Sequence, residues 1–162
     1  MFEFFKKMAF SILILLIGIP GSGKTTWAKQ YKKEHPFTNL ICTDEIRKEI
    51  FGKDECPPEY NQMIRNEAHK RVKKILDDNS PNGRFGPEIV VDSTNCDVEE
   101  WIKYKNLGPS IIVARVFDAT PEEAIKRQKN RERKVPEDAI RGYYETLQKN
   151  KQYLPKIFNF IY

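Results

Sequence analysis

Four short apolar segments interrupt a chain that is otherwise rich in charged residues. They span residues 11–17, 39–42, 88–91 and 111–117, and longer polar stretches with helical spacing lie between them. Continuous runs of branched aliphatic residues are typical of strands in a parallel sheet that is covered on both faces. The alternation of such strands with helices predicts an α/β fold on a mostly parallel sheet.

Capping signals mark the starts of two of the helices. Thr120 with Glu123, and Asp97 with Glu100, match the capping-box spacing, in which two side chains satisfy free amide groups at a helix N-terminus. Residues 58–79 carry apolar side chains at helical spacing, which predicts one long amphipathic helix.

Two further stretches have less regular patterns. Prolines and glycines crowd residues 79–87, which predicts a loop between that helix and the third strand. The tail at 156–162 alternates apolar and polar residues, which predicts a last strand.

The composition is that of one folded domain. The chain has 162 residues, 40% of them hydrophobic and 31% charged, and its net charge of +5 permits an anionic partner without demanding one. Three cysteines without a CxxC spacing favour a reducing compartment, and we expect a cytoplasmic protein. The two histidines, His35 and His69, are expected at the surface.

The first apolar segment follows Lys6 and Lys7, and in this respect it imitates a secretory signal. A membrane-spanning helix needs about 20 apolar residues, more than this run supplies, and no small-residue cleavage site follows it. We therefore expect a buried strand and no membrane partner. Residues 1–8 are interpreted as a loose extension and residues 9–162 as a single domain.

Directly after that strand the chain matches the phosphate-binding loop pattern GxxxxGK[ST], and a helix-compatible run follows. In such a loop the backbone amides and the helix N-terminus surround the β-phosphate of a nucleotide. Lys24 would bridge the β- and γ-phosphates, and the Thr25 hydroxyl would ligate Mg²⁺. The predicted ATP-binding residues of this loop are Gly18, Pro20, Gly21, Ser22, Gly23, Lys24, Thr25 and Thr26.

Two classes of phosphate-loop protein fit the sequence less well. A GTP switch needs an Asn-Lys-x-Asp element, but Asn150-Lys151 is followed by Gln152 and Tyr153. An ATP-driven motor needs a strand that ends in Asp-Glu, which Asp44-Glu45 offers only after the second strand. The third class is a phosphotransferase, which needs a carboxylate beside the γ-phosphate to take the proton of an acceptor hydroxyl.

Asp44 matches that need because it ends the second strand, and ligands of parallel sheets sit at the carboxyl ends of the strands. Arg47 lies one helical turn further on, so the pair can hold an acceptor that has a hydroxyl and a negative charge. The structural alternative is a helix cap with a solvated ion pair.

The third strand ends in Asp92-Ser93-Thr94-Asn95, which we expect to face the same crevice. Asp92 would hold a water of the Mg²⁺ shell or orient Lys24 or Arg47, and Thr94 and Asn95 would help to bind the acceptor. Capping of the next turn is the alternative for Asp92.

The densest basic run is at 126–134, where Arg127 and Arg131 share one helical face. A guanidinium matches phosphate oxygens with its planar fork, so we interpret these two residues as a lid that closes over ATP. For Lys129, Arg133 and Lys134 a solvated surface role is preferred.

Together, the phosphate loop and several residues beyond it resemble the kinase domain of phage-type 5′-hydroxyl polynucleotide kinases, over about residues 12–150. Those further residues are Trp27, Asp44, Arg47, Ser93-Thr94-Asn95, Arg127, Arg131 and Val135-Pro136. The placement of the carboxylate at Asp92, before Ser93, is more similar to the wider group of small kinases that includes zeta-toxin-like enzymes.

The resemblance implies an ATP-dependent 5′-hydroxyl kinase with a five-stranded parallel sheet, helices on both faces and a mobile lid. It assigns ATP and Mg²⁺ to Lys24 and Thr25, the general base to Asp44, the phosphate beside the acceptor hydroxyl to Arg47, and a catalytic lid contact to Arg131. We therefore expect ATP and Mg²⁺ as cofactors and 5′-hydroxyl RNA or DNA as acceptor. A small-molecule acceptor and an ATP-hydrolysing module are the alternatives.

Overall fold

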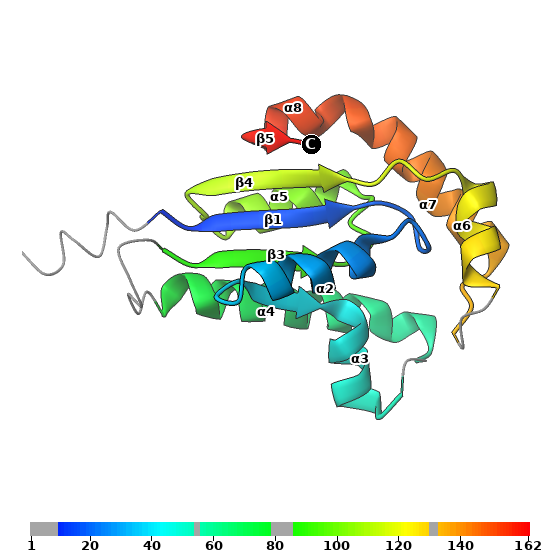
Figure 1. The fold of residues 1–162 in the computed structure, drawn as a ribbon, viewed down its shortest axis with the longest axis horizontal. Helices are drawn as coiled ribbons and strands as arrows, with labels where there is room; N and C mark the ends of the chain where they lie inside the picture. Colours follow the sequence, from blue (N-terminus) through cyan, green and yellow to red (C-terminus); the bar gives the residue numbers. More distant parts are fainter. Residues whose placement is uncertain (1–9, 54–55, 79–85, 130–132) are drawn as a thin grey trace, which may run out of the picture.

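The computed structural model describes residues 10–53, 56–78, 86–129 and 133–162, so the predicted extension at 1–8 lies outside it. Five strands form one sheet in the order β2-β3-β1-β4-β5, and every pairing is parallel (Figure 1). The predicted α/β fold with a five-stranded parallel sheet is thus confirmed. Most of the predicted loop at 79–87 also falls outside the described residues.

Four strands coincide with the apolar segments to within one residue. They are β1 (Ile12–Ile17), β2 (Asn39–Cys42), β3 (Glu88–Asp92) and β4 (Ile111–Val116). The central strand β1 pairs with β3 and β4 over its whole length apart from one residue on the β3 side, and its apolar run is covered on both faces, as parallel strands require.

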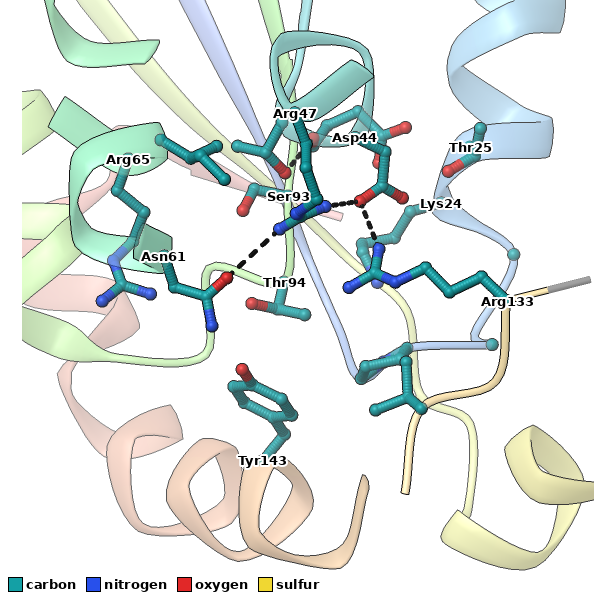
Figure 2. Close-up of a pocket in the computed structure, with 17 residues that line it drawn as sticks. Lys24, Thr25, Asp44, Arg47, Asn61, Arg65, Ser93, Thr94, Arg133 and Tyr143 are labelled. Atoms are coloured by element: carbon teal, nitrogen blue, oxygen red, sulfur yellow. Dashed lines mark hydrogen bonds and ion pairs between the residues drawn. The ribbon is translucent and has the colours of Figure 1, made fainter. Parts of the chain in front are cut away.

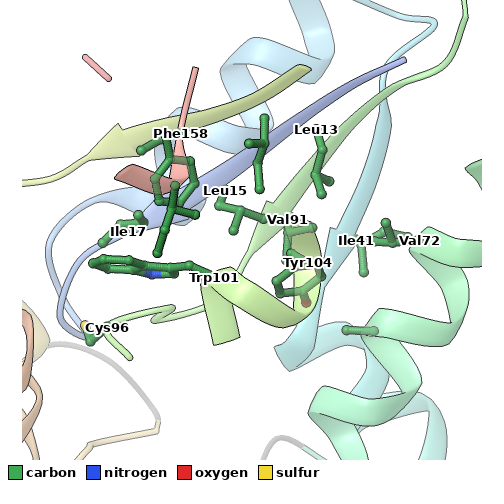
Figure 3. Packing of buried hydrophobic residues seen from close by; sticks show 14 of the residues in the cluster. Leu13, Leu15, Ile17, Ile41, Val72, Val91, Cys96, Trp101, Tyr104 and Phe158 are labelled. Atoms are coloured by element: carbon green, nitrogen blue, oxygen red, sulfur yellow. The ribbon is translucent and has the colours of Figure 1, made fainter. Parts of the chain in front are cut away.

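Helices cover the two faces of the sheet unequally. They are α2 (Lys24–Glu34), α3 (Thr43–Phe51), α4 (Asn61–Asp77), α5 (Val98–Asn106), α6 (Pro121–Gln128), α7 (Glu137–Asn150) and α8 (Leu154–Ile157). Leu13, Leu15 and Ile17 of β1 point into the larger core, which α4, α5, α7 and α8 close (Figure 3). Ile14 and Leu16 point to the other face, where α2 packs.

Three local predictions need correction. The segment predicted as one helix begins with a 3-10 turn, η1 (Pro58–Tyr60), before α4. The tail is not a strand throughout, because η2 (Lys151–Tyr153) and α8 precede the short strand β5 (Phe160–Ile161). Thr120 forms the complete capping box, whereas Asp97 caps α5 alone because Glu100 is turned toward α4.

His35 is exposed, as expected, but the prediction for His69 is wrong. The His69 side chain is only 12% exposed, packs at a tilt against the Tyr104 ring and lies 3.2 Å from a carboxylate oxygen of Glu100. The three cysteines are unpaired. Among the described residues, no helix is long and apolar enough to cross a membrane.

Candidate functional site

The phosphate loop joins the end of β1 to the start of α2. Gly21 and Gly23 have φ angles of 85° and 100°, in the left-handed region that glycine adopts readily. Gly23 is the N-cap of α2, and within the described part of the chain no side chain caps that helix. The first amides and the positive end of the helix dipole are therefore left for an anion.

Lys24 folds back onto its own loop. Its Nζ donates to the carbonyl oxygens of Gly18, at 2.7 Å, and Ile19, at 2.8 Å, and lies 3.3 Å from the Ser22 hydroxyl. The side chain is buried, and these carbonyls compensate its charge.

Asp92 ends β3 beside the phosphate loop. Burial raises the pKa of Asp92, while a hydrogen bond with Thr25 and the charge of Lys24 oppose that rise. The thiol of Cys42 also lies 3.6 Å from its carboxylate. The end of β3 thus places the buried Asp92 carboxylate close to the Thr25 hydroxyl and the Lys24 ammonium group.

Asp44 and Arg47 form an ion pair in the first turns of α3. The Arg47 side chain is 8% exposed and that of Asp44 is 55% exposed. Arg47 Nη2 also lies 3.4 Å from Oδ1 of Asn61 at the start of α4. The Nε atom of Arg47 is buried without a hydrogen-bond partner among the described residues, so this guanidinium has donor capacity that the protein does not use.

A second arginine reaches Asp44 from the segment after α6. Arg133 Nη1 donates to Asp44 Oδ1 at 2.8 Å, so one carboxylate oxygen accepts from two guanidinium groups (Figure 2). The predicted lid residue Arg127 is exposed on α6 and does not line the cavity, and Arg131 lies outside the described residues. Among the described residues after α6, the arginine that lines the cavity is therefore Arg133, for which the sequence favours a solvated surface role.

These groups line one cavity of about 370 Å³. The structure brings most of the predicted residues to it: Pro20, Gly21, Gly23, Lys24, Thr25, Asp44, Arg47, Asp92 and Thr94. Gly18, Ser22, Thr26, Asn95 and Arg127 are not in the lining. Glu45, the motor candidate, is exposed and also outside it.

Asn95 has a structural role instead of the predicted contact with the acceptor. Its side-chain amide donates to the Leu16 carbonyl at 2.9 Å, and its own carbonyl accepts from Trp101 Nε1 at 2.6 Å. Its φ of 45° places it in the left-handed region, which asparagine tolerates. Asn95 therefore ties the end of β3 to β1 and α5.

The lining also includes residues that were not among the predicted site residues, among them Asn61, Arg65, Arg133 and Tyr143. Asn61 and Arg65 lie in a helix with many charged residues, so the sequence pattern does not distinguish them from their neighbours. They line the cavity because that helix, α4, lies beside α3.

The site residues fit Mg²⁺ as well. Magnesium in such sites takes a hydroxyl, carboxylates through water, and oxygens of the substrate phosphates. The buried Asp92 carboxylate beside the Thr25 hydroxyl supplies the protein part of that set. Among the described residues no cluster of three or more histidine, cysteine or acidic side chains could hold a metal by protein ligands alone.

Comparison with known families agrees with this site. The family model AAA_33, described as an AAA domain, matches residues 13–152. The chain belongs to this family. The matched residues of the AAA_33 domain run from β1 into η2 and contain every residue that lines the cavity.

Relatives of the AAA_33 domain include kinases. It is 29% identical to a protein of Autographa californica nuclear polyhedrosis virus assigned as a bifunctional polynucleotide kinase/RNA ligase, over 93% of this chain and 22% of the relative. It is 26% identical to the L-seryl-tRNA(Sec) kinase of Methanococcus maripaludis, over 83% of this chain and 51% of that protein. The chain thus spans about half or less of these relatives.

The fold is also found in a solved assembly. A chain in the structure of the Pnkp1/Rnl/Hen1 RNA repair complex superposes with a TM-score of 0.73 at 24% identity, over 89% of this chain and 46% of that chain. The predicted resemblance to P-loop kinases, and to polynucleotide kinase domains among them, is confirmed.

Proposed function

We propose that this domain is an Mg²⁺- and ATP-dependent kinase that transfers the γ-phosphate of ATP to the 5′-hydroxyl of RNA or DNA. The observation that carries the proposal is the pair Asp44 and Arg47, a carboxylate with a buried, under-used guanidinium, in the same cavity as the phosphate loop. A hydroxyl acceptor that also carries a phosphate needs both groups. The relative named as a polynucleotide kinase supports this acceptor class.

The phosphate loop holds the nucleotide in this proposal. The amides at the start of α2 bind the β-phosphate, and Lys24 exchanges its bonds to Gly18 and Ile19 for phosphate oxygens. Thr25 and Asp92 would hold Mg²⁺, which would supply positive charge beside the transferred phosphoryl group.

Asp44 is the general base. Within the described residues, its two guanidinium contacts share Oδ1. We assign Oδ2 to the acceptor, where it takes the 5′-hydroxyl proton as that oxygen bonds to the γ-phosphorus and the bond to the leaving ADP oxygen breaks. Arg47 binds the phosphate on the 3′ side of the acceptor nucleoside, and Arg133 neutralises charge near the transferred group.

Matched variants of two adjacent carboxylates test this proposal. With ATP and a 5′-hydroxyl oligonucleotide, Asp44→Asn is expected to lower kcat by 10²-fold or more, because the proton acceptor is lost. Glu45→Gln changes an exposed side chain outside the cavity and is expected to retain activity. Label transfer from ATP only to small metabolites would reject the polynucleotide acceptor, and loss of ATP hydrolysis in Glu45→Gln alone would favour the hydrolase.

A further inference from the structure

Arg65 extends the line of basic groups in the cavity beyond the residues that the reaction needs. It lines the same cavity as Arg47 and belongs to α4, one helical turn after Asn61. Figure 2 shows Arg65 beyond Asn61, on the side away from Arg133. Side chains four residues apart on a helix have Cβ atoms about 5–6 Å apart, and Asn61 itself contacts Arg47, so the two guanidinium groups are separated by a single side chain.

The contacts of Arg65 leave donors available. Its Nη2 donates to the exposed side chain of Gln62 at 2.9 Å, a partner that is replaced at little cost. Its Nε is buried and lies 3.9 Å from Glu100 Oε1, too far for a hydrogen bond, and has no other partner among the described residues. A guanidinium has five N–H donors, so most of its capacity is unused.

Glu100 fixes this arginine from the core side. The carboxylate is 10% exposed, 2.8 Å from Lys103 Nζ and 3.2 Å from His69 Nε2, and it belongs to α5 while His69 and Arg65 belong to α4. A buried carboxylate is costly unless cations surround it. Glu100 therefore pairs with the Nε edge of the Arg65 guanidinium and does not contact its Nη groups.

We propose that Arg65 forms a second anion site that binds the next phosphodiester of the acceptor strand, one nucleotide beyond the phosphate on Arg47, with Glu100 as a positioning residue. The inference rests on the proposed polynucleotide kinase activity. It divides possible acceptors by charge: an acceptor with two successive phosphates uses both arginines, and a nucleoside 3′-monophosphate uses Arg47 alone.

Steady-state kinetics with two acceptors tests the site. The acceptors are a 5′-hydroxyl nucleoside 3′-monophosphate and a 5′-hydroxyl dinucleotide with a 3′-phosphate. The readout is the ratio of kcat/KM for the dinucleotide to kcat/KM for the monophosphate. Loss of one charge-assisted phosphate contact is worth roughly tenfold, so Arg65→Ala is expected to lower this ratio about tenfold. Arg65→Lys keeps the charge and is expected to restore part of it.

Matched controls separate the site from general effects. Arg71 belongs to the same helix but pairs with Glu49 and Glu67 outside the cavity, so Arg71→Ala is expected to keep the wild-type ratio. Glu100→Gln is expected to lower the ratio of kcat/KM for the dinucleotide to kcat/KM for the monophosphate. Loss of stability alone lowers both kcat/KM values equally and leaves this ratio unchanged. The salt slope of log kcat/KM for the dinucleotide is expected to fall by about 0.7 in Arg65→Ala, the value for one single-strand phosphate contact.

The outcomes are distinct. If the wild-type protein phosphorylates both acceptors without preferring the dinucleotide, or Arg65→Ala changes both equally, the second anion site is rejected while the proposed kinase activity stands. If neither acceptor is phosphorylated, the proposed function fails and the inference fails with it.

Discussion

Two glycines of the phosphate loop give a matched test of how the loop is held. Gly21 and Gly23 both have φ angles in the left-handed region, so alanine at either position pays a similar backbone penalty of about 1–2 kcal/mol. Their surroundings differ. A Cβ on Gly21 would lie 2.8 Å from the Ala124 carbonyl oxygen and 3.2 Å from its Cα and Cβ, whereas one on Gly23 meets nothing within 4 Å.

The difference between the two variants therefore measures the close packing of the loop on α6. The contact at Gly21 is with helix backbone, which cannot rotate away, and overpacking of this kind costs about 1–3 kcal/mol. We expect Gly23→Ala to lower the free energy of unfolding by about 1–2 kcal/mol and Gly21→Ala by about 2–5 kcal/mol. The second change corresponds to a fall in Tm of about 4–20 °C for a chain of this size.

Urea unfolding followed by circular dichroism measures both values in the absence of nucleotide. The m-values are expected to match that of the wild-type protein, because neither change alters the surface exposed on unfolding. If Gly21→Ala is no more destabilising than Gly23→Ala, the loop is not packed on Ala124 as described and the reasoning is wrong.

Three further predictions concern groups outside the loop. Burial alone would raise the pKa of Glu100, but His69 and Lys103 lower it to about 2. The ionised carboxylate therefore stabilises the folded state, and the difference in free energy of unfolding between wild type and Glu100→Gln is expected to be largest above pH 4.5 and to vanish as the pH falls toward 2. Urea unfolding at stepped pH measures this difference. Trp101→Phe leaves the buried Asn95 carbonyl without its donor and is expected to cost about 2 kcal/mol or more by urea unfolding, whereas a loss under 0.5 kcal/mol would contradict that bond. Iodoacetamide at pH 8 is expected to modify Cys56 in the native protein and the two buried cysteines only after unfolding, as read by mass spectrometry; early labelling of Cys42, whose pKa burial raises to about 12, would contradict its environment.

The elements that the sequence predicted correctly are those with strong local signals. The strand at 12–17 is apolar throughout because both of its faces are covered, and the glycines after it are needed for a left-handed turn. Thr120 and Glu123 cap a helix through contacts three residues apart. Interactions of this kind lie within one turn of the chain, so their spacing is visible without the fold.

The parts that were missed depend on contacts between distant segments. Arg133 reaches Asp44 across 89 positions of the sequence, and no local pattern separates it from the neighbouring basic residues. Glu100 has the spacing of a capping residue, but its side chain is buried beside α4 and pairs with His69 instead. Asn95 follows two polar residues that line the cavity, yet its side-chain amide donates a hydrogen bond to the Leu16 carbonyl instead. In each case the fold decides between two local options.

The arrangement around β1 has a mechanical consequence. Gly18 N donates to the Thr94 carbonyl, and Phe117 N donates to the Ile17 carbonyl. Backbone hydrogen bonds therefore join the loops that follow β1, β3 and β4 at the carboxyl ends of these strands. These bonds couple the three loops, so displacement of one is expected to displace the other two. In the proposed reaction, ATP and the acceptor would therefore meet over backbone that moves as one unit.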